Sequence, residues 1–295
     1  MAEKTPAAEL PIEEHVKVVH SRLLREKPAP YVPKGEDDPE VVTIRPGAAK
    51  RAMFSGEDIV EIDLPVGSRV IYPKAPIRGL PDPDEAIRHA LMHPEKMNPL
   101  PHYLKPGMKV TICIDDISLP LPPMERPDMR ERILHIVLEY LDNAGVTDVH
   151  LIVATAFHRR MTDGEIRRMV GPEIFKRFHP DRLYNHDAEN KEGMKWLGHA
   201  EKGEAVEINR RAAESDLIIY VNINFVPMNG GHKSVATGLA GYKTLREHHD
   251  PEVIANCNSY MDPDGSELAR SNKRVGSFIE ARIPIIDRSS HGNLR

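Results

Sequence analysis

The residue types best suited to chemistry gather in one stretch of the chain, residues 229–250. The pair Gly230–Gly231 can adopt backbone angles closed to other residues, so that peptide N–H groups can turn toward an anion. Lys233 stands where this turn would open a helix, and His248 and His249 close the stretch. The stretch therefore offers one amine, two imidazole rings and a backbone cradle for an anion.

A structural interpretation of the same string is a tight turn followed by a solvated lysine, with the two histidines capping a surface helix. The string is not a Walker A loop. That motif has one glycine directly before the lysine and another five residues before that glycine, where this chain has His232 and Pro227. Hydrolysis of nucleoside triphosphates by such a loop is therefore not expected.

Three apolar runs, at residues 109–116, 149–155 and 216–225, are typical of buried strands, and each leads into polar side chains. Open α/β sheets bind ligands at the carboxyl ends of their strands. A lone loop histidine is often structural, but two arginines follow His158, and such a loop suits an anionic substrate. If the strands are neighbours, their ends bring four side chains to one crevice: Asp115, Asp116, His158 and Lys233.

Helical signals separate these runs. Residues 82–92 begin with acidic side chains, and residues 128–144 carry an apolar face at helical spacing. Thr162 and Glu165 have the spacing of a capping box, and residues 208–215 indicate a further helix. The alternation predicts an α/β fold with a mostly parallel central sheet flanked by helices.

The composition limits the class of protein. A chain of 295 residues with 40% apolar content can form one large or two ordinary domains, and a net charge of −5 argues against a nucleic-acid surface. Two cysteines, Cys113 and Cys257, are too few for a disulfide framework. With neither an apolar leader nor an 18-residue apolar run, we expect a cytoplasmic protein that binds no membrane.

The N-terminal part of the chain differs in composition from the rest. Residues 1–50 are rich in Pro, Glu and Lys, which predicts a partly flexible extension that packs on another subunit or stays mobile. One short helix is possible near residues 13–25. Residues 59–65 and 68–72 are typical of two strands around a glycine turn, so we expect a hairpin where the folded part begins.

Several motifs follow one another in an order that is more specific than any one of them: Asp115-Asp116, Arg126-Pro127, residues 154–162, 185–188, 208–211, 230–234 and 238–244. On these motifs the sequence resembles the nickel-pincer-nucleotide lactate racemase family, over roughly residues 56–255. The resemblance implies the N-terminal domain of a two-domain racemase-like fold. Residues 51–275 would form this catalytic domain, and residues 276–295 the start of a missing or truncated second domain.

The resemblance also implies an activity and a site. Members of this family racemise or epimerise 2-hydroxy acids by moving a hydride to a nickel-pincer nucleotide and back. By resemblance, Lys233 holds this cofactor through a thioamide bond, and His249 binds the nickel, with His248 beside it. His158 takes the hydroxyl proton, and Arg126 grips the substrate carboxylate. Five further residues complete the implied cofactor site: Asp115, Asp116, Gly230, Gly231 and Ser234.

Two departures from the family pattern bear on the substrate. The segment between Asp116 and Arg126 is longer than in the family, and Ile223 occupies the place of a second proton-transfer histidine. His232 or His186 could take that second role. We therefore expect a substrate other than lactate, either a bulkier or more polar hydroxy acid or a sugar acid.

A third departure concerns partners. Because the family continues into a second domain, we expect that this domain is either a separate polypeptide or lost, and a homo-oligomer is possible. One alternative function is a non-catalytic or half-subunit relative that binds a nucleotide or a partner chain. The other is a hydrolase whose divalent metal ion is held by His158, His249 and an aspartate.

Overall fold

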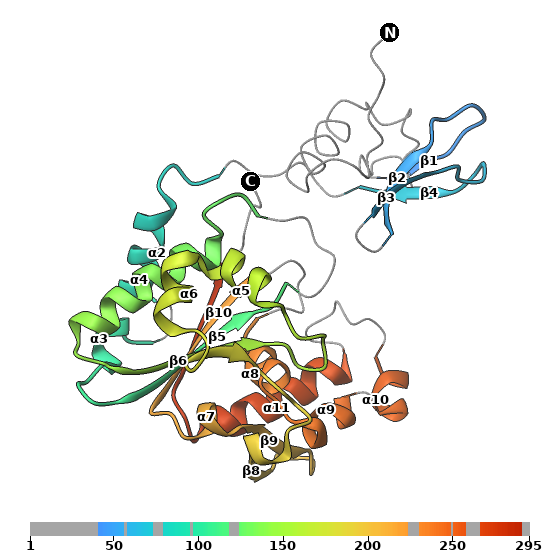
Figure 1. Cartoon of the computed structure of the whole chain (residues 1–295). Coiled ribbons are helices and arrows are strands. Elements are labelled where there is room, and N and C mark those ends of the chain that lie inside the picture. The colour runs from blue at the N-terminus through green and yellow to red at the C-terminus, as the bar shows by residue number, and fades with distance from the viewer. Residues whose placement is uncertain are drawn as a thin grey trace. The chain divides into compact units, whose positions relative to one another are not determined.

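A computed structural model describes residues 41–55, 58–72, 79–94, 97–117, 124–223, 230–248, 250–257 and 266–290. The chain divides into two compact units. The first comprises residues 1–78 with 120–123, and the second comprises residues 79–119 with 124–295 (Figure 1).

The first unit contains two antiparallel strand pairs. β1 (Val41–Thr43) pairs with β4 (Arg69–Ile71), and β2 (Arg51–Ser55) pairs with β3 (Asp58–Ile62). The predicted hairpin between residues 59–65 and 68–72 is therefore wrong, although both strands form.

The cause of this difference is a contact that lies far away in sequence. Gly67 donates its N–H to the Ile44 carbonyl at 2.9 Å, and Ile44 donates to the Ser68 carbonyl at 2.8 Å. The chain after the glycine turn thus lies against β1, while β3 folds back on β2. Residues 41–50, expected as extension, include β1 and belong to this unit. The possible helix near residues 13–25 lies outside the described residues.

The second unit is built on a five-stranded sheet in the order β11-β10-β5-β6-β7 (Figure 1). Every pairing between neighbours in this described sheet is parallel, which confirms the α/β prediction. Its strands are β5 (Lys109–Asp115), β6 (Asp148–Ala154), β7 (Leu183–Asn185), β10 (Leu217–Ile223) and β11 (Ile285–Ser290).

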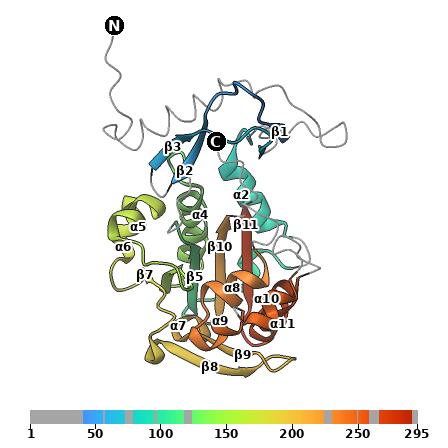
Figure 2. The same cartoon turned by 90° about the vertical axis from the view of Figure 1, so that its right-hand side faces the viewer.

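Helices cover both faces of the sheet (Figures 1 and 2). Helices whose apolar residues share one core cluster lie on the first face: α2 (Pro83–Met92), α3 (Leu100–Tyr103), α4 (Met129–Asn143), α5 (Asp163–Val170) and α6 (Pro172–Phe178). The helices of the second cluster are α7 (Arg210–Ala213), α8 (His232–Gly238) and α11 (Glu267–Glu280). Near them are α9 (Tyr242–His248), α10 (Pro251–Ala255), the 3₁₀ turn η3 (Lys191–Gly193) and an antiparallel pair, β8 (Met194–His199) and β9 (Ala205–Asn209).

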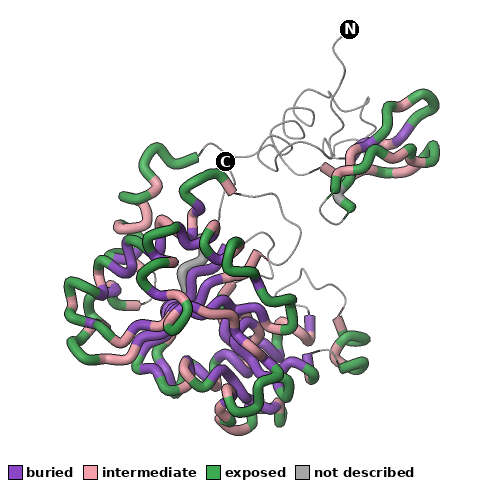
Figure 3. The backbone as a smooth tube through the Cα atoms, viewed as in Figure 1, coloured by how far each residue is buried: buried purple, intermediate pink, exposed green. Residues whose placement is uncertain are grey.

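The two core clusters follow from the two-residue period of a strand. Successive side chains of β5 point to opposite faces, so Ile112 and Ile114 pack with α4 while Cys113 packs with α8 and α11. Figure 3 shows the buried residues concentrated in the strands and the inner helix sides. Both faces are covered, which explains why the strands appear in the sequence as continuous apolar runs.

Local signals placed three helix starts correctly. Asp82 accepts a hydrogen bond from the Glu85 N–H at 2.9 Å. Asp128 accepts one from the Arg130 N–H at 2.9 Å. The capping box at α5 is complete, with both the Thr162 and the Glu165 side chains bonded to backbone N–H groups. The helix predicted over residues 208–215 is shorter, because β9 continues to Asn209 and α7 covers only Arg210–Ala213.

The C-terminal residues differ from the expectation of a second domain. α11 packs on α8, and β11 is the edge strand of the same sheet, in parallel register with β10. Residues 276–290 therefore complete this unit. Among the described helices, none has the length and apolar character needed to cross a membrane.

The strand order reverses between β5 and β10. From β5 the chain proceeds through β6 to β7 on one side, whereas β10 and β11 lie on the other. Such a reversal separates the connections that follow the two strands and opens a crevice at their carboxyl ends. Asp115 and Ile223 end the two strands on either side of this point.

Candidate functional site

Asp115 bridges the two strands at the point of reversal. Its Oδ2 accepts a hydrogen bond from the Ile223 N–H at 3.0 Å, and the Tyr220 hydroxyl also donates to its carboxylate. Burial raises the pKa of Asp115 to about 6, while these two hydrogen bonds and the charge of Arg130 act in the opposite direction. The site therefore holds a carboxyl group whose charge changes just below neutral pH.

Arg130 fixes the start of α4 beneath this carboxyl group. Its guanidinium makes two hydrogen bonds to Asp128, at 2.9 and 2.7 Å, and a third to the backbone carbonyl of Asp115 at 3.2 Å. The side chain is only 4% exposed. Arg126, expected to grip a substrate carboxylate, lies in the exposed segment just before α4, and its role stays a prediction.

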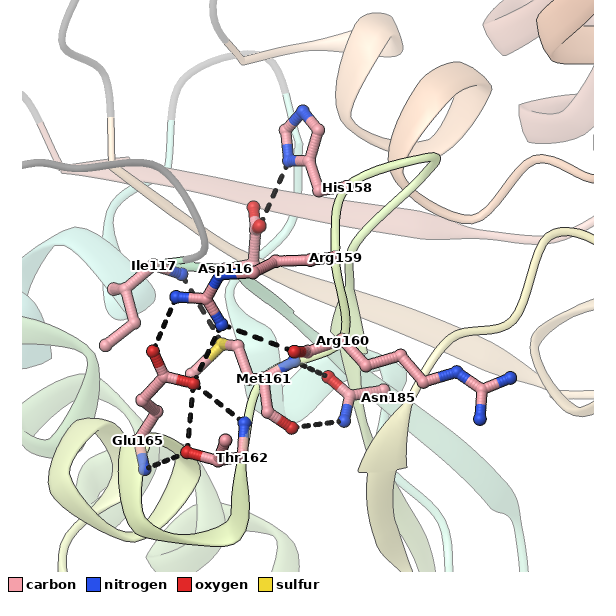
Figure 4. Close-up of polar contacts among 9 residues, drawn as sticks. All are labelled: Asp116, Ile117, His158, Arg159, Arg160, Met161, Thr162, Glu165 and Asn185. Carbon is pink, nitrogen blue, oxygen red and sulfur yellow. Dashed lines mark hydrogen bonds and ion pairs between the residues drawn. The ribbon is translucent and has the colours of Figure 1, made fainter. Parts of the chain in front are cut away.

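Asp116 and His158 form a close polar pair from neighbouring strand ends. His158 Nδ1 lies 3.0 Å from Asp116 Oδ2, and the imidazole remains 43% exposed while the carboxylate is 11% exposed. Figure 4 shows the ring above Asp116, apart from the cluster around Glu165. The hydrogen bond to Asp116 raises the pKa of His158, against burial and the positive charge of Lys233. A proton held on Nδ1 by the carboxylate leaves Nε2 as the basic atom.

The two arginines after His158 have structural partners instead of presenting an open anion site. Arg159 makes a two-pronged ion pair with Glu165, at 2.9 and 2.6 Å (Figure 4). This pairing, with hydrogen bonds from Thr162, lowers the pKa of Glu165 to about 2. Arg160 pairs with Asp187. Both arginines therefore anchor the loop that carries His158.

Lys233 enters the same region from the opposite side of the point of reversal. It is the second residue of α8 and is partly buried. Burial lowers the pKa of its amine, while the negative charge of Asp115 raises it. The charges of Asp115, Asp116 and Lys233 all act on the pKa of His158, so these four side chains lie within electrostatic range of one another.

The glycine turn before α8 has the predicted backbone. Gly230 and Gly231 have φ angles of 87° and 60°, values that favour glycine, and Gly231 is the N-cap of the helix. Ser234 is buried and accepts a hydrogen bond from Asn222 Nδ2 at 3.1 Å. The turn thus positions Lys233, whereas Ser234 fastens α8 to β10.

The two histidines expected to act as a second base are held by other parts of the fold. His232 Nε2 lies 2.7 Å from Glu280 Oε2 on α11. His186 is 1% exposed, with Nε2 at 2.9 Å from the Ala240 carbonyl and Nδ1 at 3.3 Å from Asn209 Nδ2. Burial lowers the pKa of His186. Both rings thus join elements of the fold. His186 is buried between its partners, which does not support a proton-transfer role, and His232 lies against α11.

One of the two expected metal ligands, His248, lies at the end of α9. His248 is the last residue of that helix and is 4% exposed, and His249 lies outside the described residues. Among the residues that the structure describes, no group of three or more His, Cys, Asp or Glu side chains could hold a metal ion. The half-buried amine of Lys233, with its lowered pKa, does fit a covalent attachment point.

Sequence reasoning missed two residues of this region, Tyr220 and Arg130. Tyr220 was part of an apolar run and was assigned to the core, yet its hydroxyl reaches Asp115. A signal was available, because Tyr220 and Asn222 are alternate residues of one strand and so share a face. Arg130 lay within a predicted amphipathic helix, and nothing in the sequence indicated that its side chain turns back to β5.

Comparison with known proteins gives a consistent result. The family model for the lactate racemase N-terminal domain matches residues 56–262. The lactate racemase of Thermoanaerobacterium thermosaccharolyticum is 26% identical over 179 residues, which cover 59% of this chain and 39% of that protein. The lactate racemase of Lactiplantibacillus plantarum is 27% identical over 175 residues, covering 58% and 39%. The chain thus spans about two fifths of the length of the curated relatives it matches.

Two solved structures share the fold. The lactate racemase apoprotein from Thermoanaerobacterium thermosaccharolyticum superposes with a TM-score of 0.57 at 21% identity, covering 80% of this chain and 54% of that one. A protein from Thermotoga maritima gives a TM-score of 0.51 at 20% identity, covering 70% and 49%. At these identities the likeness concerns the fold.

Proposed function

The chain belongs to the lactate racemase N-terminal domain family, and from that premise we propose that it carries the proton-transfer site of a 2-hydroxy acid racemase or epimerase. The observation that carries the proposal is the pairing of His158 with Asp116 at 3.0 Å, at strand ends that also present Asp115 and Lys233. A histidine that is oriented by a carboxylate and lies near a lysine amine is suited to taking a proton from a hydroxyl group. This arrangement supports a catalytic role for His158 more than a structural one.

The proposed reaction inverts the carbon that bears the hydroxyl group. His158 Nε2 would take the hydroxyl proton while C2 gives up a hydride to a bound acceptor, so that a planar 2-keto acid forms. Return of the hydride to the opposite face and of the proton to the oxygen gives the other stereoisomer. Asp116 keeps the ring oriented and stabilises the imidazolium, which is the usual service of a carboxylate behind a catalytic histidine.

The family resemblance implies a nickel-pincer nucleotide, and the residues present fit its attachment. When bound, this group supplies the acceptor that takes the hydride from C2 and returns it. Lys233 would hold it covalently, the N–H groups of the Gly230–Gly231 turn would face its phosphate, and His248 or His249 would provide an imidazole ligand. The lowered pKa of Lys233 increases the share of neutral amine, the form that can make a covalent bond.

The substrate is proposed to be a 2-hydroxy acid or sugar acid other than lactate. Arg126 is exposed and would bind the carboxylate, for which a guanidinium is well shaped. Ile223, which replaces a second histidine in the family pattern, is 1% exposed, and its N–H serves Asp115. The side chain of Ile223 therefore cannot transfer a proton at the second face of the intermediate.

The test is racemisation in D₂O. The protein is produced with a source of the nucleotide and incubated with single enantiomers of 2-hydroxy acids, and the products are analysed by chiral chromatography and NMR. We expect inversion without deuterium at C2, because the hydride returns without exchanging with solvent. His158→Gln should lower turnover by roughly 10²- to 10⁴-fold, whereas His135→Gln, at an exposed position of α4, should leave it unchanged. Deuterium at C2, or full turnover without His158, would contradict the proposal.

A further inference from the structure

Two aromatic side chains lie at the surface beside the residue proposed to move the proton. Phe157 is 44% exposed and Tyr242 is 52% exposed, and their ring centroids are 5.8 Å apart with the ring planes tilted by 55°. They come from distant segments, the turn after β6 and the first residue of α9. A soluble protein rarely gathers exposed aromatic surface without a use for it.

The turn that carries Phe157 has an unfavourable backbone. The His158 N–H donates to the Thr155 carbonyl at 2.7 Å, which closes a tight turn with Ala156 and Phe157 at its corners. Ala156 has a φ of 49°, in the left-handed region that residues with a Cβ seldom adopt. Strained residues of this kind cluster at functional sites. Phe157 directly precedes His158 in the chain, so both side chains leave the same turn.

The second aromatic residue is tied to the same turn. The Ala156 N–H donates to the Gly238 carbonyl at 3.3 Å, and the Tyr242 N–H donates to the Ala188 carbonyl at 2.9 Å. Ala156 also packs against the small apolar cluster of Ala188, Ala240 and Leu245. The aromatic pair therefore joins the turn that bears His158 to the helix that ends at His248.

A third exposed aromatic residue, Trp196, lies on a different element and has a cation–π partner. Trp196 lies on β8 and is 45% exposed. The Lys243 amine lies 5.6 Å from the centroid of the Trp196 ring, and the centroid of the His199 ring lies 5.0 Å away in an edge-to-face arrangement. Trp196 thus takes part in a cation–π contact on a different element. It provides a control of matched type and exposure.

We propose that Phe157 and Tyr242 form a subsite for the side chain of the substrate, and that this side chain is aromatic or large and apolar. The inference rests on the proposed function, because it takes the C2 hydroxyl to lie at His158. Two rings tilted by 55° offer a face and an edge to a third ring, the arrangement that aromatic groups prefer. A 2-hydroxy acid with an aromatic group close to C2, such as 3-phenyllactate, is therefore the substrate type that the proposed subsite favours.

The test compares 3-phenyllactate with lactate by ligand-observed NMR titration of the full chain. We expect 3-phenyllactate to bind at least about tenfold more tightly, since a phenyl ring buries far more apolar surface than a methyl group. Phe157→Ala and Tyr242→Ala should each lower this preference by roughly three- to tenfold, the size of an aromatic pair. Tyr242→Phe, which keeps the ring, and Trp196→Ala should retain it. Phe157→Leu keeps apolar volume without a ring and should fall between wild type and Phe157→Ala.

Two results would overturn the subsite. One is equal binding of the two acids by wild type, or a preference that survives both alanine substitutions. The other is a dimer in sedimentation velocity that dissociates in Phe157→Ala, because the rings would then be covered by a second copy. The D₂O assay separates the two proposals. If 3-phenyllactate binds through the rings but is not inverted, the proposed reaction is contradicted and the proposed subsite is supported. If lactate and 3-phenyllactate are inverted with equal efficiency, the proposed subsite is contradicted and the proposed reaction is supported.

Discussion

On the side of the sheet that α4 covers, β10 presents Leu217, Ile219 and Val221, whereas on the side that α8 covers it presents Tyr220 and Asn222. These five side chains are almost completely buried. The first set packs in the apolar cluster of α4, while Asn222 and the Tyr220 hydroxyl are bonded to Ser234 and Asp115. One strand thus serves as scaffold on one side and as support for the site on the other.

The same contrast holds for two acidic residues near Arg130. Asp128 accepts two hydrogen bonds from the Arg130 guanidinium and one from its backbone N–H. Asp115 accepts one from the Ile223 N–H and one from Tyr220, and Arg130 reaches only its backbone carbonyl. A buried carboxylate with a full cationic partner strengthens the fold, whereas a buried carboxylate without such a partner is held at a cost.

The largest effect is expected from Asp128→Asn. The change leaves the buried guanidinium of Arg130 without its charged partner, which we expect to lower the free energy of unfolding by about 3 to 5 kcal/mol. Urea denaturation measures the loss. Asp142→Asn is the control, because the Asp142–Arg177 pair is nearly half exposed and such pairs contribute at most about 1 kcal/mol. Equal losses in the two variants would remove the distinction between them.

A truncation on the α4 side should come next. Leu134 is 0% exposed in the core cluster of α4, and Leu134→Ala should lower the free energy of unfolding by about 2 to 5 kcal/mol. Turnover per folded molecule should stay unchanged, because Leu134 lies in the apolar core cluster and not among the residues proposed for the site. A large drop in turnover under conditions where the variant is fully folded would show that packing on the α4 side also affects the site.

Asp115→Asn should act with the opposite sign. The pKa of Asp115 is about 6 in the folded chain, against 3.8 for an ordinary aspartate, so the folded state binds its proton more tightly. Its contribution to stability is intact below pH 3.8 and is lost as pH rises toward 6, by up to about 3 kcal/mol in total.

The neutral asparagine removes this loss. The variant should therefore be more stable than wild type at pH 8 and no more stable at pH 3, which denaturation at the two pH values can measure. If the variant is destabilised equally at pH 3 and pH 8, the hydrogen bonds and charges around Asp115 fully offset the cost of burying its ionised carboxylate.

The elements that the sequence predicted correctly depend on neighbours in the chain. The strands that became β5, β6 and β10 followed from apolar runs, and the start of α5 followed from Thr162 and Glu165. The meeting of Asp115, His158 and Lys233 also followed, because parallel strands place their carboxyl ends together. Turn geometry, capping and strand direction are all set over a few residues.

What escaped prediction depends on partners distant in sequence. β4 pairs with β1 instead of β3, β11 joins the main sheet, and Arg160 pairs with Asp187. His186 and His232 looked like candidate bases because their chemistry permits it. Only packing shows that one bonds to Ala240 and the other to Glu280.

The smallest expected effect belongs to Tyr220→Phe, which removes one hydrogen bond to Asp115 at a cost of about 1 kcal/mol. Without that donor the ionised form of Asp115 is less favoured and its pKa rises further. Lys233 then loses part of its negative neighbour, so the pKa of its amine should fall. The pH dependence of Lys233 modification by an amine reagent, followed by mass spectrometry, measures this change. Exposed Lys243 in the same digest is the internal control, and an unchanged Lys233 profile would contradict the link.

The contact between α8 and α11 has a consequence for how the molecule is made. A side chain at Gly276 would place its Cβ 2.3 Å from the Cβ of His232, so the two helices meet with no room between them at the residue before Lys233. The part of α11 that α8 packs against lies more than thirty residues after Lys233 in the chain. A ribosome-bound chain that already carries Lys233 therefore still lacks the surface that positions this residue. The packing around α8 is therefore complete only when α11 is also present.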